Sequence, residues 1–483
     1  MSNANTSGAI SRIAKELANI QKAQDLSLAV ACRDSDVRTV RALIIGPPET
    51  AYEYGFFEFE CKFTKEYPIK SPEVRCITTN GGKCRFNPNI YAEGKVCLSI
   101  LGTWRGERGE EWSSAQGLES ILLSIQSLMS ANPYENEPGF ENVKKTQKKP
   151  MAYIAKIRHE TLRISVVQRL ESMLGVHGVK DDHATRTSEA SRDNLDVVNN
   201  SPQNEPNSDS DGVSTPATDS SAYEYDAEAT YNALGEAEWD PFSDLLKRRF
   251  LWYYDCYVKS ISSHMEEQRD GARFERMEFE YPPNSMEGHF GYATLLKRIH
   301  AIHAALADET ASWLKAGILQ VTAGSQLATQ LAFQFEQLCH VWHSPTHQSA
   351  TRIELSLPHP KNHFLWAITI FGAPSTNLDG GVFNLQFAIS PNFPDVQPRV
   401  TFQTPISHHR VNSKGDFCYF PNRTDDIANH IETIVNSIAD ENPTYDPRAI
   451  INPELFSLYW GGDDKRKIYL RRLRRSAQDS SEF

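Results

Sequence analysis

The residues whose types and spacing best suit chemistry lie in the segment 85–115, where a cysteine follows an Asn-Pro-Asn motif. Cys97 offers a sulfur that can carry an acyl group, and Asn89 offers an amide N–H that can stabilise an oxyanion. Pro88 fixes φ within the motif, and Gly94 suits a turn with positive φ that lets the chain double back. We therefore expect Asn89 to lie beside Cys97 in an acyl-transfer site.

This motif resembles the active-site signature of ubiquitin-conjugating enzymes. Its spelling from Phe86 to Trp104, FNPNIYAEGKVCLSILGTW, is most similar to the Z-type branch of that family, and it has Asn87 where most members have His. The resemblance implies that Cys97 accepts ubiquitin or a ubiquitin-like modifier as a thioester from an activating enzyme and passes it to a substrate lysine or a ligase. It also implies that Asn89 is the oxyanion donor or a support of the loop. ATP is consumed by the separate activating enzyme, so no cofactor is expected.

The same resemblance implies roles for residues outside the motif. The family often places an acid after an Asn-Pro turn, and here such a turn is followed by Glu135, which we prefer, and by Glu137. A merely solvated loop acid explains either residue equally well. Arg12 and Lys15 on the first helix are expected to contact the activating enzyme, although a solvated helix face also explains them. The expected ligase contacts are Pro68, Ile69 and Ala115.

Hydrophobic periodicity predicts the elements that position these residues. Apolar residues at helical spacing indicate helices at 10–20 and 118–128, and extended apolar runs indicate strands at 39–45, 57–63 and 74–77. Within 57–63 the apolar residues alternate with charged ones, which is typical of a half-buried strand. The order of helix, antiparallel meander and helix predicts an α+β fold with helices packed on one sheet. A ubiquitin-conjugating core has the same order.

An internal repeat predicts a second copy of this fold. The segment 46–50 (GPPET) recurs at 372–376 (GAPST), and the strand 57–63 recurs at 383–389, both at an offset of 326. Such a duplication sets the domain count. We therefore expect two ubiquitin-conjugating-type domains, each an antiparallel four-stranded meander with packed helices, joined by a helical extension and a disordered linker.

The linker is identified by its composition. Residues 176–222 contain no Phe, Trp or Tyr and hold nine acids against three Lys or Arg, so they cannot bury enough apolar area to offset backbone ordering. Near the C-terminus, the segment 465–475 contains seven cations; we favour a solvated helix over a nuclear address or a site for an acidic partner. The expected segments are a catalytic core at 8–140, helical extension at 141–175, disordered acidic linker at 176–222, helical extension at 223–310, degenerate second copy at 318–462 and basic tail at 463–483.

The second copy keeps a cysteine but loses the residues around it. Counting back from Cys418, the register of the Asn-Pro-Asn motif falls on His408, His409 and Arg410. Arg410 could serve as an oxyanion donor and His408 as a base. We favour instead an inactive copy that binds ubiquitin, the first copy or a ligase, and we keep Cys418 as a second candidate acyl carrier.

Composition bounds the partners and the compartment. The net charge of −12 gives no reason to expect a nucleic-acid partner, and no long apolar run indicates a membrane span. The eight cysteines form no C-x-x-C pair, which favours a reducing cytoplasmic or nuclear compartment over a disulfide framework. The expected partners are therefore the modifier, its activating enzyme, a ligase and protein substrates.

Three alternatives compete with this interpretation. Both copies could form a non-catalytic scaffold that holds ubiquitin or other partners, but such a scaffold would not need the Asn89 and Cys97 pair. A papain-like hydrolase would need a His base paired with the cysteine, and none is recognisable. Cys339 and the nearby histidines at 340, 343 and 347 suggest zinc, but Pro345 interrupts the helix that would align them, and no metal site is expected.

Overall fold

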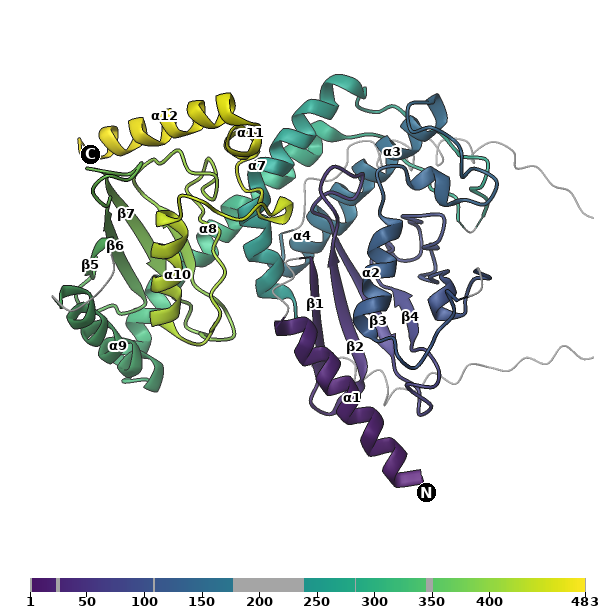
Figure 1. Cartoon of the computed structure of the whole chain (residues 1–483), viewed down its shortest axis with the longest axis horizontal. Coiled ribbons are helices and arrows are strands. Elements are labelled where there is room, and N and C mark those ends of the chain that lie inside the picture. The colour runs from purple at the N-terminus through teal and green to yellow at the C-terminus, as the bar shows by residue number, and fades with distance from the viewer. Residues whose placement is uncertain are drawn as a thin grey trace, which may run out of the picture. The chain divides into compact units, whose positions relative to one another are not determined.

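The structure is a computed structural model that describes residues 2–22, 27–106, 109–176, 239–282, 284–344 and 351–482 (Figure 1). The predicted disordered linker therefore lies outside the described residues, apart from position 176. Among the described residues, none of the helices has the length and apolar character needed to cross a membrane.

The first sheet is an antiparallel meander with strand order β1-β2-β3-β4. It follows helix α1 and precedes helix α2, so the predicted order of elements is confirmed. Apolar residues of α1 and α2, including Ile13, Leu17, Ile121 and Ile125, pack in one core with the sheet. The bounds are α1 Ser2–Lys22, β1 Leu28–Arg33, β2 Asp36–Ile45, β3 Phe56–Lys62, β4 Glu73–Cys76 and α2 Leu118–Leu128.

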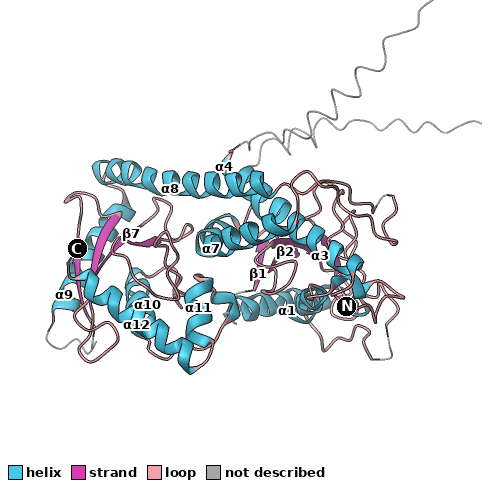
Figure 2. Ribbon diagram, turned by 90° about the horizontal axis from the view of Figure 1, so that it is seen from above, coloured by secondary structure: helices cyan, strands magenta, loops and turns pink. Residues whose placement is uncertain are grey.

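A helical extension covers the opposite face of this sheet. Leu43 and Phe56 point into a second core formed with the extension helices, which lie on the far side of the sheet from α1 (Figure 2). The prediction of a half-buried strand at 57–63 is wrong at its first half, because Glu58 is only 5% exposed and pairs with Arg169 at 2.6 Å. The extension comprises α3 Lys148–Glu160, a π-helical stretch Thr161–Gln168, α4 Arg169–Leu174, α7 Ser243–Glu267 and α8 Tyr292–Thr322.

The second sheet repeats the first. Its strand order is β5-β6-β7-β8, and the pair Ile370↔Phe383 reproduces Ile44↔Phe57 at the predicted offset of 326. Gly372 is required as Gly46 is, since an added Cβ would lie 1.6 Å from the Leu378 carbonyl oxygen. The bounds are α9 Gln326–His343, β5 Arg352–Ser356, β6 Leu365–Phe371, β7 Val382–Ala388, β8 Arg399–Phe402 and α10 Ile427–Ala439.

Two C-terminal helices complete the second copy: α11 Pro453–Trp460 and α12 Asp463–Ser480. The basic segment lies in α12, so a helix is confirmed there. It is not freely solvated, however, because Tyr469, Leu473 and Ala477 join the core of the second copy. The cations stay on the outer face, since the buried residues recur at four-residue spacing along one side of the helix.

Candidate active site

A hairpin brings Asn89 and Cys97 together. The backbone N–H of Cys97 donates to the carbonyl of Asn89 at 2.8 Å. The next residues along the hairpin, Ile90 and Val96, form an antiparallel β-bridge. Gly94 makes the turn with φ of 93°, and an added Cβ would lie 2.4 Å from the carbonyl oxygen of Cys76. The sequence prediction that the chain doubles back here is confirmed.

Asn87 anchors the Asn-Pro-Asn motif to the protein interior. It is fully buried, and its Nδ2 donates to the Tyr52 hydroxyl at 3.0 Å and to the Leu128 carbonyl at 2.8 Å. Its Oδ1 accepts the backbone N–H of Asn89 at 2.9 Å and the side-chain amide of Asn136 at 3.3 Å. Asn87, which stands where most of the family has His, therefore has a complete set of hydrogen bonds. It fixes the backbone that presents Asn89.

The Asn89 side chain points back to the nucleophile's own backbone. Its Nδ2 donates to the carbonyl oxygen of Cys97 at 3.1 Å. In this geometry the amide braces the loop, which is the second of the two roles that the resemblance implies. The oxyanion role stays a prediction.

The thiol of Cys97 is enclosed but has charged and polar neighbours. The residue is 3% exposed, and burial raises the pKa of its thiol, against the lowering effects of Lys95, the Tyr91 hydroxyl and Arg85. Tyr91 is half-buried, and Lys95 is exposed.

Arg85 connects the motif to the helical extension, and sequence reasoning missed it. Its guanidinium is buried, donates to the carbonyls of Pro88 and Phe279, and lies 4.5 Å from the centre of the Tyr91 ring. Phe279 belongs to the segment between α7 and α8, almost 200 residues away. No local pattern could have indicated this contact.

The two candidate acids occupy different surroundings. Glu137 pairs with Arg85 at 3.3 Å, and burial raises the pKa of its carboxyl. Glu135 accepts from the side-chain amide of Asn132 at 3.2 Å. The contacts thus connect Glu137, rather than the preferred Glu135, to the residues beside the cysteine. Neither role near an incoming lysine is tested by these contacts.

The two candidate contacts for an activating enzyme differ in availability. Arg12 donates to Glu16 at 2.8 Å and to the carbonyl of Gln116 at 2.6 Å, whereas Lys15 is exposed. Glu16 also accepts from the Tyr67 hydroxyl at 2.7 Å and from the N–H of Leu118 at 2.9 Å. Arg12 and Glu16 therefore tie α1 to the start of α2, which leaves Lys15 as the freer candidate.

The three candidate ligase contacts belong to neighbouring loops. The indole N–H of Trp112 donates to the carbonyl of Pro68 at 2.9 Å, which holds the loop of residues 67–70 against the segment that carries Ala115. Ile69 is 79% exposed, Ala115 is exposed, and Pro68 is half-buried. An apolar side chain this exposed is available to a partner, but its use stays a prediction.

The second cysteine is in a different situation. The N–H of Cys418 donates to the carbonyl of Arg410 at 3.0 Å, as Cys97 does to Asn89, so the predicted register is correct. Cys418 is fully buried in the core that contains α7, and burial raises the pKa of its thiol to about 12. Its role as a second acyl carrier stays a prediction.

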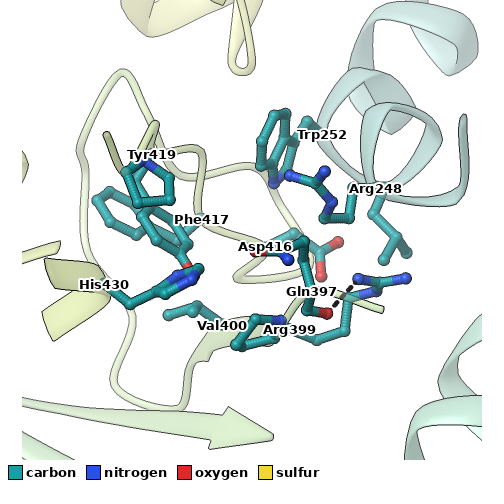
Figure 3. A pocket seen from close by; sticks show the side chains of 12 residues that line it. Arg248, Trp252, Gln397, Arg399, Val400, Asp416, Phe417, Tyr419 and His430 are labelled. Atoms are coloured by element: carbon teal, nitrogen blue, oxygen red, sulfur yellow. Dashed lines mark hydrogen bonds between the residues drawn. The ribbon is translucent and has the colours of Figure 1, made fainter. Parts of the chain in front are cut away.

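Helix α7 also covers the strand ends beside Cys418. Figure 3 shows Arg248 and Trp252 of α7 on the same pocket as Phe417 and Tyr419 of the second copy. The enclosed volume is about 20 Å³, which is room for about one water molecule. Nothing as large as a modifier's C-terminal tail fits at this position.

The suggested zinc ligands do not form a cluster in the part of the chain that the structure describes. His343 Nδ1 lies 2.7 Å from the carbonyl of Cys339 on the same helix, and the described residues hold no group of three or more metal-ligating side chains. His347 lies outside the described residues.

Comparison with known proteins identifies the class to which this fold and hairpin belong. The family model for ubiquitin-conjugating enzyme matches residues 12–161 and 340–446, which together make up just over half of the chain. The chain belongs to the ubiquitin-conjugating enzyme family.

Within that family it is similar to ubiquitin-conjugating enzyme E2 Z. It is 47% identical to the Xenopus tropicalis protein over 160 residues, covering 33% of this chain and 50% of that protein. It is 46% identical to the human protein over 160 residues, covering 33% and 44% respectively. The chain thus spans about half the length of these curated relatives. A solved structure of the E2 domain of a Toxoplasma gondii ubiquitin conjugating enzyme matches with 29% identity and a TM-score of 0.26, covering 32% of this chain and 97% of that one.

Proposed function

We propose that this protein is a ubiquitin-conjugating transferase whose first copy carries ubiquitin, or a ubiquitin-like modifier, as a thioester on Cys97. The observation that carries the proposal is the hairpin that sets Asn89 and Cys97 side by side on a backbone anchored by Asn87. A protein that only held partners would not need this pair.

The first step is an exchange of thioesters. The Cys97 thiolate attacks the thioester carbonyl of the activating enzyme's adduct, the new C–S bond forms, and the activating enzyme's cysteine leaves as a thiolate. The two thioesters have similar energy, so the exchange is close to thermoneutral. A small fraction of thiolate is then sufficient for it to proceed. Burial raises the pKa of the Cys97 thiol, and Lys95 and Arg85 offset part of this rise.

The second step passes the acyl group to an amine. A lysine nitrogen attacks the carbonyl carbon, the C–N bond forms, the C–S bond breaks, and the amine proton is lost to an acid–base group or water. Charge develops on the carbonyl oxygen, where an amide donor is worth about 100- to 1000-fold in rate. Asn89 supplies this donor once its amide leaves the Cys97 carbonyl. Glu135, the preferred acid, and Glu137, the one paired with Arg85, are the candidates to orient the lysine.

The partners follow from exposed residues of the first copy. Lys15, with Arg12 behind it, would meet the activating enzyme, and Pro68, Ile69 and Ala115 would meet a ligase. The second copy would act as a non-catalytic binding module, which is the scaffold alternative restricted to one half of the chain. The buried Cys418 favours this assignment.

A loading assay tests the proposal. The wild-type chain, Cys97→Ala and Cys418→Ala are each incubated with ATP, several activating enzymes and several modifiers, and separated with and without reductant. We expect one reducible adduct in the wild type and in Cys418→Ala, and none in Cys97→Ala. A reducible adduct that persists in Cys97→Ala and disappears in Cys418→Ala would reverse the assignment of the two copies.

A further inference from the structure

The second copy contains a cavity that the proposed transfer chemistry does not use. Its volume is about 130 Å³, and it lies between β6, the turn after β6, and helices α10 and α12. The lining residues are mostly apolar and buried. They include Ile370, Leu378, His408, Ile438, Tyr469 and Leu473.

The turn on one wall has a close counterpart in the first copy. Glu49 and Ser375, at the predicted offset of 326, have φ of 62° and 63°. Thr50 Oγ1 donates to the carbonyl of Pro47 at 2.7 Å, and Thr376 Oγ1 donates to the carbonyl of Ala373 at 2.7 Å. The two turns therefore share this conformation and hydrogen bond. An added Cβ at Gly46 would lie 3.0 Å from the Tyr52 Cβ, and one at Gly372 would lie 3.2 Å from the Leu378 Cβ, so these two side chains start from matching positions.

The two copies fill the space beyond this turn differently. In the first copy the Tyr52 ring is fully buried, and its hydroxyl donates to the carbonyl of Phe86 at 2.8 Å and accepts from Asn87 Nδ2 at 3.0 Å. In the second copy Leu378 is shorter by the outer ring atoms and the hydroxyl. Leu378 lines the cavity, so the cavity lies on the side of the turn where the first copy places the Tyr52 ring.

A hydrogen-bond donor also remains on the cavity wall. His408 corresponds to Asn87: its Nδ1 accepts the N–H of Arg410 at 3.2 Å, as Asn87 Oδ1 accepts the N–H of Asn89. Burial lowers the pKa of His408 to about 3, so the ring is neutral and the proton lies on Nε2. His408 is 2% exposed and lines the cavity, and its Nε2 has no hydrogen-bond partner among the described residues. Asn87 Nδ2 has the corresponding position in the first copy, and its acceptor is the Tyr52 hydroxyl.

We propose that this cavity is a binding site for a single phenolic ring. The ring occupies the space that Tyr52 fills in the first copy, and its oxygen accepts from His408 Nε2. The size agrees, because apolar cavities of about 150 Å³ bind benzene. A ligand of seven or eight heavy atoms is expected to bind with a dissociation constant on the order of 1 mM. This inference does not depend on the transfer activity of the first copy.

Saturation-transfer NMR titrations of the full-length chain test the proposal. p-Cresol represents a free phenolic ring, N-acetyl-tyrosinamide represents the side chain of a peptide, and toluene lacks the oxygen. We expect saturable binding of at least one phenol, and we expect p-cresol to bind roughly two- to tenfold more tightly than toluene, which is the contribution of one hydrogen bond. Saturable binding of either phenol supports the proposal, and the comparison of the two separates the sources.

Substitutions of Leu378 locate the site. Leu378→Tyr restores the ring of the first copy and should weaken p-cresol binding at least tenfold, whereas Leu378→Ile, which conserves volume, should retain it. Circular dichroism and the thermal midpoint check that each variant is folded, and Leu378→Phe replaces Leu378→Tyr if the latter does not fold. The proposal is overturned if the wild type shows no saturable binding of either phenol, or if binding is unchanged in the filled variant.

Discussion

The side-chain amide of Asn89 donates to the backbone carbonyl of Cys97 at 3.1 Å, and the backbone N–H of Cys97 donates back to Asn89 at 2.8 Å. The Asn89 side-chain amide, the proposed oxyanion donor, thus already lies beside Cys97, but it is hydrogen-bonded to the Cys97 backbone carbonyl. In the structure this side chain braces the loop. We propose that it also donates to the oxyanion when an acyl group occupies the sulfur.

The first prediction separates these two functions. Asn89→Ala should leave thioester loading nearly intact and slow discharge to free lysine about 100- to 1000-fold, because charge builds on the carbonyl oxygen only in the second step. Single-turnover discharge of the purified adduct measures this rate. The matched control is Asn136→Ala, which removes an amide that braces Asn87 and Leu128 without touching Cys97. If Asn89→Ala lowers loading and discharge equally, its role is structural only.

The second prediction concerns the reactivity of the Cys97 thiol. Its pKa is raised by burial, lowered by Lys95 and raised by Glu93, so its alkylation rate should increase steadily from pH 7 to 9. Lys95→Met should slow alkylation at neutral pH and Glu93→Gln should accelerate it, each by less than about threefold, because both residues are exposed and screened. Quantitative mass spectrometry of the Cys97 peptide gives the rates. Changes of the same sign in the two variants would refute the electrostatic explanation.

The third prediction concerns a buried ion pair within the extension, between α3 and the segment that joins α7 to α8. Lys156 Nζ pairs with Glu280 at 2.6 Å, and both side chains are at most 1% exposed. Lys156→Met leaves the Glu280 carboxylate buried without its partner and should lower the free energy of unfolding by about 3–5 kcal/mol. Denaturant titration measures the loss. The double variant Lys156→Met/Glu280→Gln should recover part of it, and a double variant no more stable than the single one would show that the charge is not the cause.

The fourth prediction concerns acid stability of the second copy. His430 is 1% exposed, its Nδ1 pairs with the Tyr419 hydroxyl at 2.9 Å, and burial lowers its pKa to about 4. In the unfolded chain this histidine binds a proton near pH 6.5, whereas in the folded chain it binds one only near pH 4. The free energy of unfolding should therefore fall as the pH drops from 6.5 towards 4, by at most about 3 kcal/mol.

His430→Gln should reduce this acid dependence of the thermal midpoint while lowering the midpoint at pH 7; the part that remains comes from other buried histidines such as His408. His340→Gln, at an exposed position on α9, is the matched control and should leave both unchanged. An unaltered acid slope in His430→Gln would contradict the assignment to this histidine.

The sequence was sufficient for the features that depend on local pattern. Strands β2, β3 and β4 and the helix at 118–128 follow from hydrophobic periodicity, whereas β1 was not located by it. The hairpin at Gly94 follows from the conformational freedom of glycine. The second sheet follows from the constant offset between the copies, which the pairs Ile44↔Phe57 and Ile370↔Phe383 reproduce.

The features that were missed depend on contacts between distant segments. Glu58 is buried because Arg169 of the extension pairs with it, so the alternation of polar and apolar residues in β3 misled the prediction. Arg85 is fixed by Phe279, and Cys418 is covered by a helix that begins at Ser243. The amino-acid types of these residues do not indicate which distant segment will cover them.

The most direct test of the central claim replaces one atom of the proposed acyl carrier. In Cys97→Ser, loading with modifier and activating enzyme should yield an oxyester at residue 97 that resists reductant and is cleaved by mild alkali, whereas the wild-type adduct is released by reductant. Intact-mass and peptide mass spectrometry would locate both adducts. A Cys97→Ser chain that still forms a reductant-sensitive adduct would place the acyl group on another cysteine and contradict the account.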